Sequence, residues 1–318
     1  MTTTSPTTTH MPVLPQQDGG IFITDGGLET TLLFLEGIDL PDFAAFPLLD
    51  SEDGRAALRR YFTPYLDIAE RAGTGIVLDA PTWRANADWG TRLGYDHDAL
   101  AAINVRAVEF VKELAAEHPG LRSVVNGVHG PRGDGYVVGA AMTADEATRY
   151  HALQARAFAA AGADMATAVT MTYVGEAIGV ARAAADAGLP SVIGFTVETD
   201  GRLPSGDTLV DAIAAVDACG AAPAYFMVNC AHPSHFEATL GDADAATLAR
   251  IGAIRANASR MSHEELDNAE ELDRGDPAEL RDDYRRLGDL LSNLCVVGGC
   301  CGTDHGHIDE IAGALIPR

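Results

Sequence analysis

Eight short apolar runs alternate with longer helical stretches along this chain, and this alternation constrains the fold more than any other feature. The runs cover residues 21–27, 75–81, 123–130, 164–171, 190–197, 224–231, 251–258 and 294–302. Most are apolar at both odd and even positions, which is typical of strands buried on both faces of a parallel sheet. Eight such strands, separated by helices, predict an α/β fold, the (β/α)8 TIM barrel.

The segments between the runs have helical features. Helices are expected at 56–71, 98–116, 143–161, 174–187, 208–219, 236–240, 245–250 and 262–291, the last broken at Gly275-Asp276-Pro277. Thr143 and Glu146 have the spacing of a capping box at the start of one of them. The stretch 261–282 is the most acidic internal segment, and it predicts either a solvated pair of helices or a loop over the site.

The domain organisation is expected to be simple. Residues 19–318 have no linker composition and predict one barrel that forms a single catalytic domain. Residues 1–18 have neither the basic start nor the apolar stretch of a secretory signal, so they predict a disordered tail. Because no apolar run reaches about 18 residues, no membrane span is expected.

Charge and cysteine content narrow the partners and the compartment. The chain carries 22 basic and 46 acidic residues, a formal charge of −24. This balance argues against nucleic acid and anionic membranes as partners, and it suits either a cationic small molecule or simple solubility. Five cysteines without a secretory signal favour a reducing, cytoplasmic location in which thiols stay free or bind metal.

Three of the five cysteines fall where a barrel places its active site. Cys300 and Cys301 are adjacent in Gly-Gly-Cys-Cys-Gly-Thr at the end of the eighth run, and Cys230 closes the sixth. The carboxyl ends of barrel strands share one face, where active sites are built. Three thiolates with a fourth position open are typical of a catalytic Zn²⁺ site. His232, two residues after Cys230, is an alternative ligand.

Other residues near strand ends have two interpretations each. Asp25, after the first strand, either holds a substrate ammonium beside the metal or caps the next helix. Trp83 either offers its indole face to an onium methyl group or packs within a loop. Arg84 either binds a carboxylate or forms a surface ion pair.

Three motifs together resemble the homocysteine S-methyltransferase family. They are Asp25-Gly26-Gly27, Val228-Asn229-Cys230, and Gly298-Gly299-Cys300-Cys301-Gly302-Thr303 followed by His307-Ile308. The resemblance spans about residues 21 to 315. The family includes the betaine- and S-methylmethionine-dependent enzymes. It implies a TIM barrel in which Cys230, Cys300 and Cys301 hold Zn²⁺.

The resemblance also implies a reaction and a set of substrate contacts. A thiol, homocysteine above all, would take the fourth zinc position as a thiolate and accept a methyl group from a sulfonium or quaternary ammonium donor, giving methionine. Asp25 and Trp83 are the expected catalytic side chains. The expected substrate contacts are Asp25, Gly26, Gly27, Asp79, Trp83 and Asn229.

One departure from the family bears on the acceptor. Family members usually carry a Glu at the end of strand four, where Val169 stands here, and that Glu helps to hold the amino group of homocysteine. Asp79 and Glu198, at predicted strand ends, are candidates to replace it. A different thiol acceptor, a metal-dependent hydrolase and a dithiol redox or zinc-sensing protein are the alternative functions, and the oligomeric state is not predicted.

Overall fold

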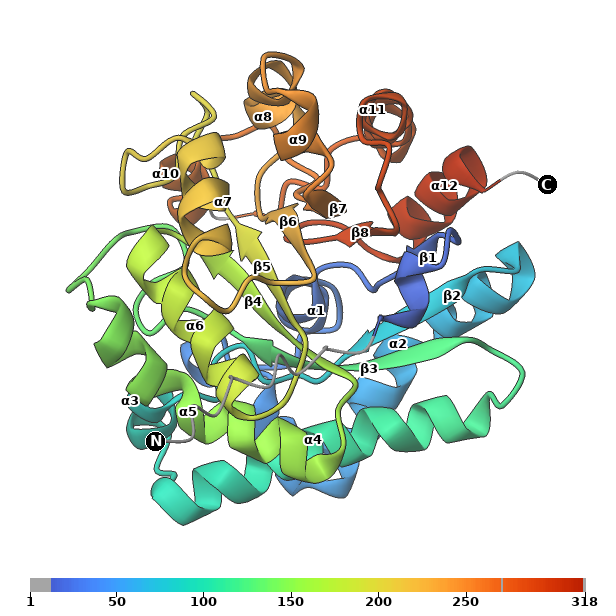
Figure 1. Cartoon of the computed structure of the whole chain (residues 1–318). Coiled ribbons are helices and arrows are strands. Elements are labelled where there is room, and N and C mark those ends of the chain that lie inside the picture. The colour runs from blue at the N-terminus through green and yellow to red at the C-terminus, as the bar shows by residue number, and fades with distance from the viewer. Residues whose placement is uncertain (1–12, 270, 317–318) are drawn as a thin grey trace, which may run out of the picture.

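A closed barrel of eight parallel strands forms the centre of the protein (Figure 1). The computed structural model describes residues 13–269 and 271–316. Neighbouring strands pair in chain order, and β1 closes the barrel by pairing with β8. The predicted TIM barrel is therefore confirmed. Its strands are β1 (Phe22–Ile23), β2 (Gly75–Asp79), β3 (Ser123–His129), β4 (Met165–Met171), β5 (Ser191–Phe195), β6 (Tyr225–Asn229), β7 (Ile251–Ala256) and β8 (Val296–Gly299).

Most of the helices surround the strands on the outside, whereas the short helix Leu28–Thr30 lies over the centre of the ring (Figure 1). They are α1 (Leu28–Thr30), α2 (Glu52–Ala72), α3 (Ala87–Arg92), α4 (His97–Glu117), α5 (Ala144–Ala161), α6 (Val174–Asp186), α7 (Leu209–Asp217), α8 (Pro233–Gly241), α9 (Ala245–Leu248), α10 (His263–Asp267), α11 (Pro277–Leu290) and α12 (His305–Leu315). The capping box of Thr143 and Glu146 at the start of α5 is confirmed. A π-helix (Thr31–Leu35) and three short 3-10 helices (Pro15–Gln17, Pro41–Phe43 and Phe46–Asp50) lie in the first fifth of the chain.

The core has two parts because each strand is buried on both faces. One apolar cluster fills the barrel interior and includes Phe22, Val77, Val128, Val169 and Met227. The larger cluster lies between the sheet and the surrounding helices. Along each strand, alternate residues belong to the inner and the outer cluster. Both sets are apolar, so the strands do not show an alternation of polar and apolar residues in the sequence.

The predicted disordered tail is wrong for part of its length. Residues 1–12 lie outside the described residues, but Leu14 and Gln16 are buried. Gln16 Nε2 donates to the hydroxyl of Tyr225, 3.0 Å away, and Leu14 joins the cluster inside the barrel. Leu14 and Gln16 therefore pack against the barrel interior, a role that polar, proline-containing sequence does not indicate.

The acidic stretch 261–282 contains α10 and the start of α11, separated by irregular backbone. The predicted break at Gly275-Asp276-Pro277 is confirmed, since α11 begins at Pro277 and Asp276 caps it. In the described part of the chain, no helix combines the length and apolar character that a membrane crossing requires.

Asp304 caps α12, the helix that follows the cysteine motif, and its charge should make stability pH-dependent. Burial alone would raise the pKa of Asp304, but the hydrogen bond from His307 and the charge of Arg274 hold it below its usual value. A lowered folded-state pKa gives stability that is complete above the unfolded pKa and is lost as the pH falls.

We expect Asp304→Asn, which keeps a capping oxygen, to be less stable than the wild type at pH 7 and to lose this difference as the pH falls below about 4. Urea unfolding of both proteins at several pH values measures this. A difference in the free energy of unfolding that does not change with pH would contradict the assignment.

Candidate active site

The three predicted metal ligands meet at the carboxyl end of the barrel. Cys230 directly follows β6, and Cys300 and Cys301 directly follow β8. Their sulfur atoms all lie within 4.8 Å of one another, although 70 residues separate Cys230 from Cys300. The Cys230 and Cys300 sulfurs are in disulfide contact, with Cα atoms 5.4 Å apart. The topology thus brings the distant thiols together as predicted.

Cys230 has an unusual backbone conformation that several groups stabilise. Its φ of 53° lies in the left-handed region, which side chains other than glycine rarely adopt. Its N–H donates to the carbonyl of Arg255, and its carbonyl accepts from Thr196 Oγ1 and His263 Nε2 at 3.1 and 2.9 Å. Strained backbone that is held in this way is characteristic of functional sites.

The first loop packs directly on the cysteine motif. A Cβ atom on Gly27 would lie 2.6 Å from the carbonyl oxygen of Cys300, so only glycine fits there. Thr30 Oγ1 accepts a hydrogen bond from the N–H of Gly302. The cap of α1 is Gly27 without a side-chain bond, so the alternative role of Asp25 as a helix cap is wrong.

Two aromatic side chains that the sequence reasoning missed support the thiols. The Tyr136 hydroxyl donates to Cys301 Sγ at 3.6 Å. The Tyr136 ring stacks on the imidazole of His263, with ring centroids 4.0 Å apart, and His263 in turn bonds to the Cys230 carbonyl. Tyr136 lies in the polar loop after β3 and His263 is the first residue of α10, and nothing in their spacing distinguishes them.

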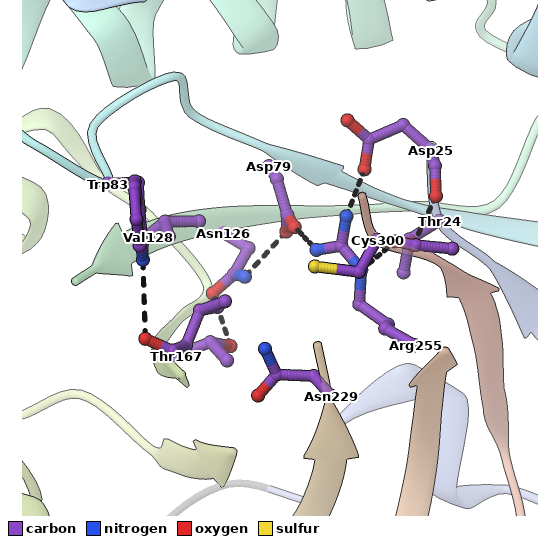
Figure 2. A network of polar contacts seen from close by, with 12 residues as sticks. Thr24, Asp25, Asp79, Trp83, Asn126, Val128, Thr167, Asn229, Arg255 and Cys300 are labelled. Carbon is purple, nitrogen blue, oxygen red and sulfur yellow. Dashed lines mark hydrogen bonds and ion pairs between the residues drawn. The ribbon is translucent and has the colours of Figure 1, made fainter. Parts of the chain in front are cut away.

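A buried guanidinium pairs with both carboxylates that were expected to bind substrate. Arg255, on β7, donates to Asp25 at 2.6 Å and also pairs with Asp79 (Figure 2). Tyr61 donates to the second oxygen of Asp25, and Asn126 donates to Asp79 at 2.7 Å. Burial and, to a lesser extent, the nearby Asp79 carboxylate raise the pKa of Asp25, and the Arg255 charge opposes both, so the pKa is raised to about 6.

The network therefore carries one net negative charge when both carboxylates are ionised. Arg255 is the main site residue that sequence reasoning missed. A charge within an otherwise apolar strand was the available signal, because such a group needs a buried partner.

A cavity of about 400 Å³ opens above the cysteines and contains most of the predicted substrate contacts. Asp25, Gly26, Gly27, Asp79 and Trp83 line it together with the three cysteines. Its charged lining is strongly acidic, with seven carboxylates against two guanidiniums: Asp25, Glu29, Asp79, Asp134, Asp267, Glu271 and Asp273 against Arg84 and Arg255. Such a cavity attracts a cation and repels an anion.

Trp83 was predicted to offer its indole face to an onium methyl group, but a cation of the chain already lies over its ring. Trp83 lines the cavity, but the guanidinium of Arg84 lies 4.2 Å from the centroid of its ring. The chain thus supplies its own cation to this indole. Trp83 Nε1 also donates to the carbonyl of Val169, whose apolar side chain lines the cavity where the family has Glu.

Two of the sequence predictions place residues in the cavity that the structure places elsewhere. Asn229 is fully buried, and its amide bonds to Thr170 through both the oxygen and the nitrogen. It braces the end of β4 and does not line the cavity, so its predicted substrate contact is wrong. Glu198, a candidate for the missing carboxylate, bonds to His263 and also lies outside the cavity lining.

The donor set fits zinc. In the described part of the chain, the cluster suited to a metal consists of the three cysteines alone, so His232 is not a ligand. His232 instead caps α8 through a bond to Ser234. Burial raises the pKa of the Cys301 thiol to about 11, against the effect of the Tyr136 hydrogen bond. A thiolate there needs an adjacent cation, and three sulfur donors select a soft metal such as Zn²⁺.

The comparison with protein families decides the identity of the chain. Residues 22–315 match the family model of homocysteine S-methyltransferase. The chain belongs to the homocysteine S-methyltransferase family. The family places it among enzymes that transfer a methyl group to homocysteine, and Zn²⁺ is the cofactor that fits its cysteine cluster. A comparison with curated protein sequences finds no significant match.

Solved structures show the same fold as this family member. The oxidized form of the homocysteine methyltransferase MmuM from Escherichia coli is 20% identical with a TM-score of 0.73, over 92% of this chain and 95% of that chain. The metallated form of MmuM is 19% identical with a TM-score of 0.72, over 93% of this chain and 96% of that chain. At these identities the likeness establishes the shared barrel.

Proposed function

We propose that Cys230, Cys300 and Cys301 hold the zinc of a methyltransferase that moves a methyl group from a cationic sulfonium or quaternary ammonium donor to homocysteine. The observation that carries this proposal is the gathering of three sulfurs within 4.8 Å at the base of an acidic cavity. Zinc bound there supplies a positive charge that keeps the acceptor sulfur ionised at neutral pH.

The charge of the cavity lining supports an onium donor. Carboxylates on the first loop, on β2 and on the segment around α10 face the same space. They raise the local concentration of a cation, whereas a neutral donor gains nothing from them. A sulfonium donor also loses its sulfonium charge in the reaction and leaves as a neutral thioether, which weakens the hold on that product.

The chemical step requires alignment more than acid–base chemistry. The acceptor sulfur forms a bond to the methyl carbon while the bond from that carbon to the donor sulfur or nitrogen breaks. The electron pair of the broken bond stays on the donor atom, which leaves as a neutral thioether or tertiary amine. Phe34, Phe43, Leu266 and Leu272 give the cavity lining apolar surface beside this displacement.

The alternative functions gain less support. The metal-suited cluster contains no histidine or carboxylate, so a hydrolase is not favoured. A thiol acceptor other than homocysteine remains the second candidate, because Val169 and the Asp25–Arg255–Asp79 network alter the usual site for an amino group. Methyl transfer to homocysteine or to another thiol would distinguish these two methyltransferase functions from a redox or zinc-sensing role. The cytoplasm remains the predicted compartment, since the proposed site needs reduced thiols.

The test is a methyl-transfer assay with the reduced, zinc-loaded protein. Homocysteine is offered with S-methylmethionine, S-adenosylmethionine and glycine betaine in turn, and methionine is quantified by mass spectrometry. We expect methionine to form with at least one onium donor and to disappear when zinc is chelated. If no donor methylates homocysteine but another thiol is methylated, the acceptor assignment is wrong.

A further inference from the structure

Two oppositely charged side chains on the inner wall of the cavity form no ion pair, unlike the other charged groups of that wall. Asp25 and Asp79 are engaged by Arg255 at hydrogen-bond distance. Glu29 and Arg84 line the same cavity without pairing with each other. A positive and a negative group that share a space without forming an ion pair suit a zwitterionic ligand between them.

Arg84 is held firmly but keeps free donors. Its side chain is buried, with 7% of the residue exposed, and its guanidinium lies 4.2 and 4.0 Å from the ring centroids of Trp83 and Trp89. Nη1 donates to the carbonyl of Gly133 at 2.8 Å, whereas the buried Nε has no partner among the described residues. An immobilised guanidinium with an unused donor is suited to a carboxylate.

Glu29 lies next to the cysteine motif. It is the second residue of α1, whose first turn packs on Cys300 and Gly302. No side chain of the described residues bonds or pairs with its carboxylate, and burial raises its pKa to about 7. A carboxylate in this position that forms no ion pair favours an ammonium as its partner, because the ammonium would stabilise its ionised form.

We propose that Glu29 and Arg84 bind the head group of an α-amino acid, with its ammonium on Glu29 and its carboxylate on Arg84. This inference rests on the proposed function and names the residues that replace the missing Glu at Val169. Either the acceptor homocysteine or an amino-acid donor such as S-methylmethionine carries this head group. The subsite differs from the Asp25 position, where Arg255 already supplies the cation.

The first experiment measures binding without catalysis. Calorimetric titration of methionine into reduced wild type, Glu29→Gln and Arg84→Lys needs neither zinc nor methyl transfer, so its failure is distinct from failure of the proposed function. We expect each variant to bind methionine about 10- to 100-fold more weakly, the usual effect of removing a charged hydrogen-bond partner. Affinities equal to the wild type would overturn the proposal.

Matched controls separate head-group contact from general electrostatics. Glu36→Gln removes a carboxylate seven residues from Glu29 whose partner is Arg60, and Arg92→Lys alters a second guanidinium near Trp89 that pairs with Asp42. Neither Glu36 nor Arg92 lines the cavity. We expect both to bind methionine as the wild type does. An equal loss in these controls would overturn the proposal.

Truncated ligands then identify which group contacts which residue. 4-Mercaptobutyrate lacks the ammonium of homocysteine, and 3-mercaptopropylamine lacks its carboxylate. We expect Glu29→Gln to weaken homocysteine binding but not 4-mercaptobutyrate, and Arg84→Lys to weaken homocysteine but not 3-mercaptopropylamine. If a variant binds homocysteine and the truncated thiols equally less tightly than the wild type does, the assignment of ammonium to Glu29 and carboxylate to Arg84 is contradicted.

Separate titrations of homocysteine and S-methylmethionine identify the occupant, because the amino acid that loses affinity in the variants is the one in the subsite. If a variant does not fold, a crystal structure of the wild type with methionine decides the question. The proposal requires the ammonium at Glu29 and the carboxylate at Arg84. A head group bound at Asp25 or Asp79 would overturn it.

Discussion

Cys300→Ser is expected to lose zinc and methyl transfer together while the barrel stays folded. Cys300 lies at the end of β8 with its sulfur near those of Cys230 and Cys301, so its replacement leaves two thiolates where three are required. A serine hydroxyl is a poor zinc ligand at neutral pH because it does not ionise. Zinc content by mass spectrometry, the assay rate and circular dichroism measure the three parts of this result.

Cys219→Ser is the control for this experiment. Cys219 is a free, partly buried cysteine outside the cluster, so its variant should keep its zinc and its rate. Both proteins must be kept reduced, because Cys230 and Cys300 are close enough to form a disulfide. A Cys300→Ser protein with full zinc content and wild-type activity would contradict the proposed ligand set.

Arg255→Met is expected to cause a large loss of stability in the barrel interior. The substitution leaves the buried carboxylates of Asp25 and Asp79 without their shared cation. Breaking a buried ion pair from one side costs about 3–5 kcal/mol, because the remaining charge has no partner. Urea unfolding at pH 7 measures this loss in the free energy of unfolding.

The pH dependence gives this prediction a specific signature. Without Arg255, the pKa of Asp25 should rise above its value of about 6, since the guanidinium no longer favours the ionised form. A folded-state pKa raised in this way means that the variant is relatively more stable at pH 5 than at pH 7. The added substitutions Asp25→Asn and Asp79→Asn should restore much of the lost stability.

Arg250→Met provides the comparison for Arg255. Arg250 precedes β7 and pairs with Asp217, and both side chains are about 30% exposed. A pair with this exposure contributes about 1 kcal/mol or less, and Arg250 also donates to the carbonyls of Pro223 and Ala224, so the loss should be measurable but smaller than for Arg255→Met. Equal losses in the two variants, or a loss in Arg255→Met that does not change with pH, would contradict the proposed charge network.

The sequence predicted the scaffold because the physical constraint on each strand is local. Strands that are covered on both faces need apolar residues at both parities, and a run such as 224–231 carries that pattern by itself. The adjacent cysteines Cys300 and Cys301 also identified the end of the eighth strand as a candidate metal site from the sequence alone. Once the barrel was assumed, its shared carboxyl face was enough to bring Cys230 to them.

The sequence did not predict the interior charge network, because its partners come from three separate strands or loops. Arg255 lies within an apolar run, and only the closed barrel shows that it faces Asp25 and Asp79. Asn229 matched a family motif, yet both its amide atoms are used to hold Thr170. Spacing along the chain does not show whether a polar side chain at a strand end faces the cavity or a neighbouring loop.

Zinc X-ray absorption on the reduced protein, with and without homocysteine, tests the central claim most directly. The account predicts three sulfur ligands at about 2.3 Å from zinc, and a fourth sulfur when homocysteine binds. Cys300→Ser should lose this sulfur shell. A shell made mainly of nitrogen or oxygen, or a sulfur count that homocysteine does not change, would contradict the account.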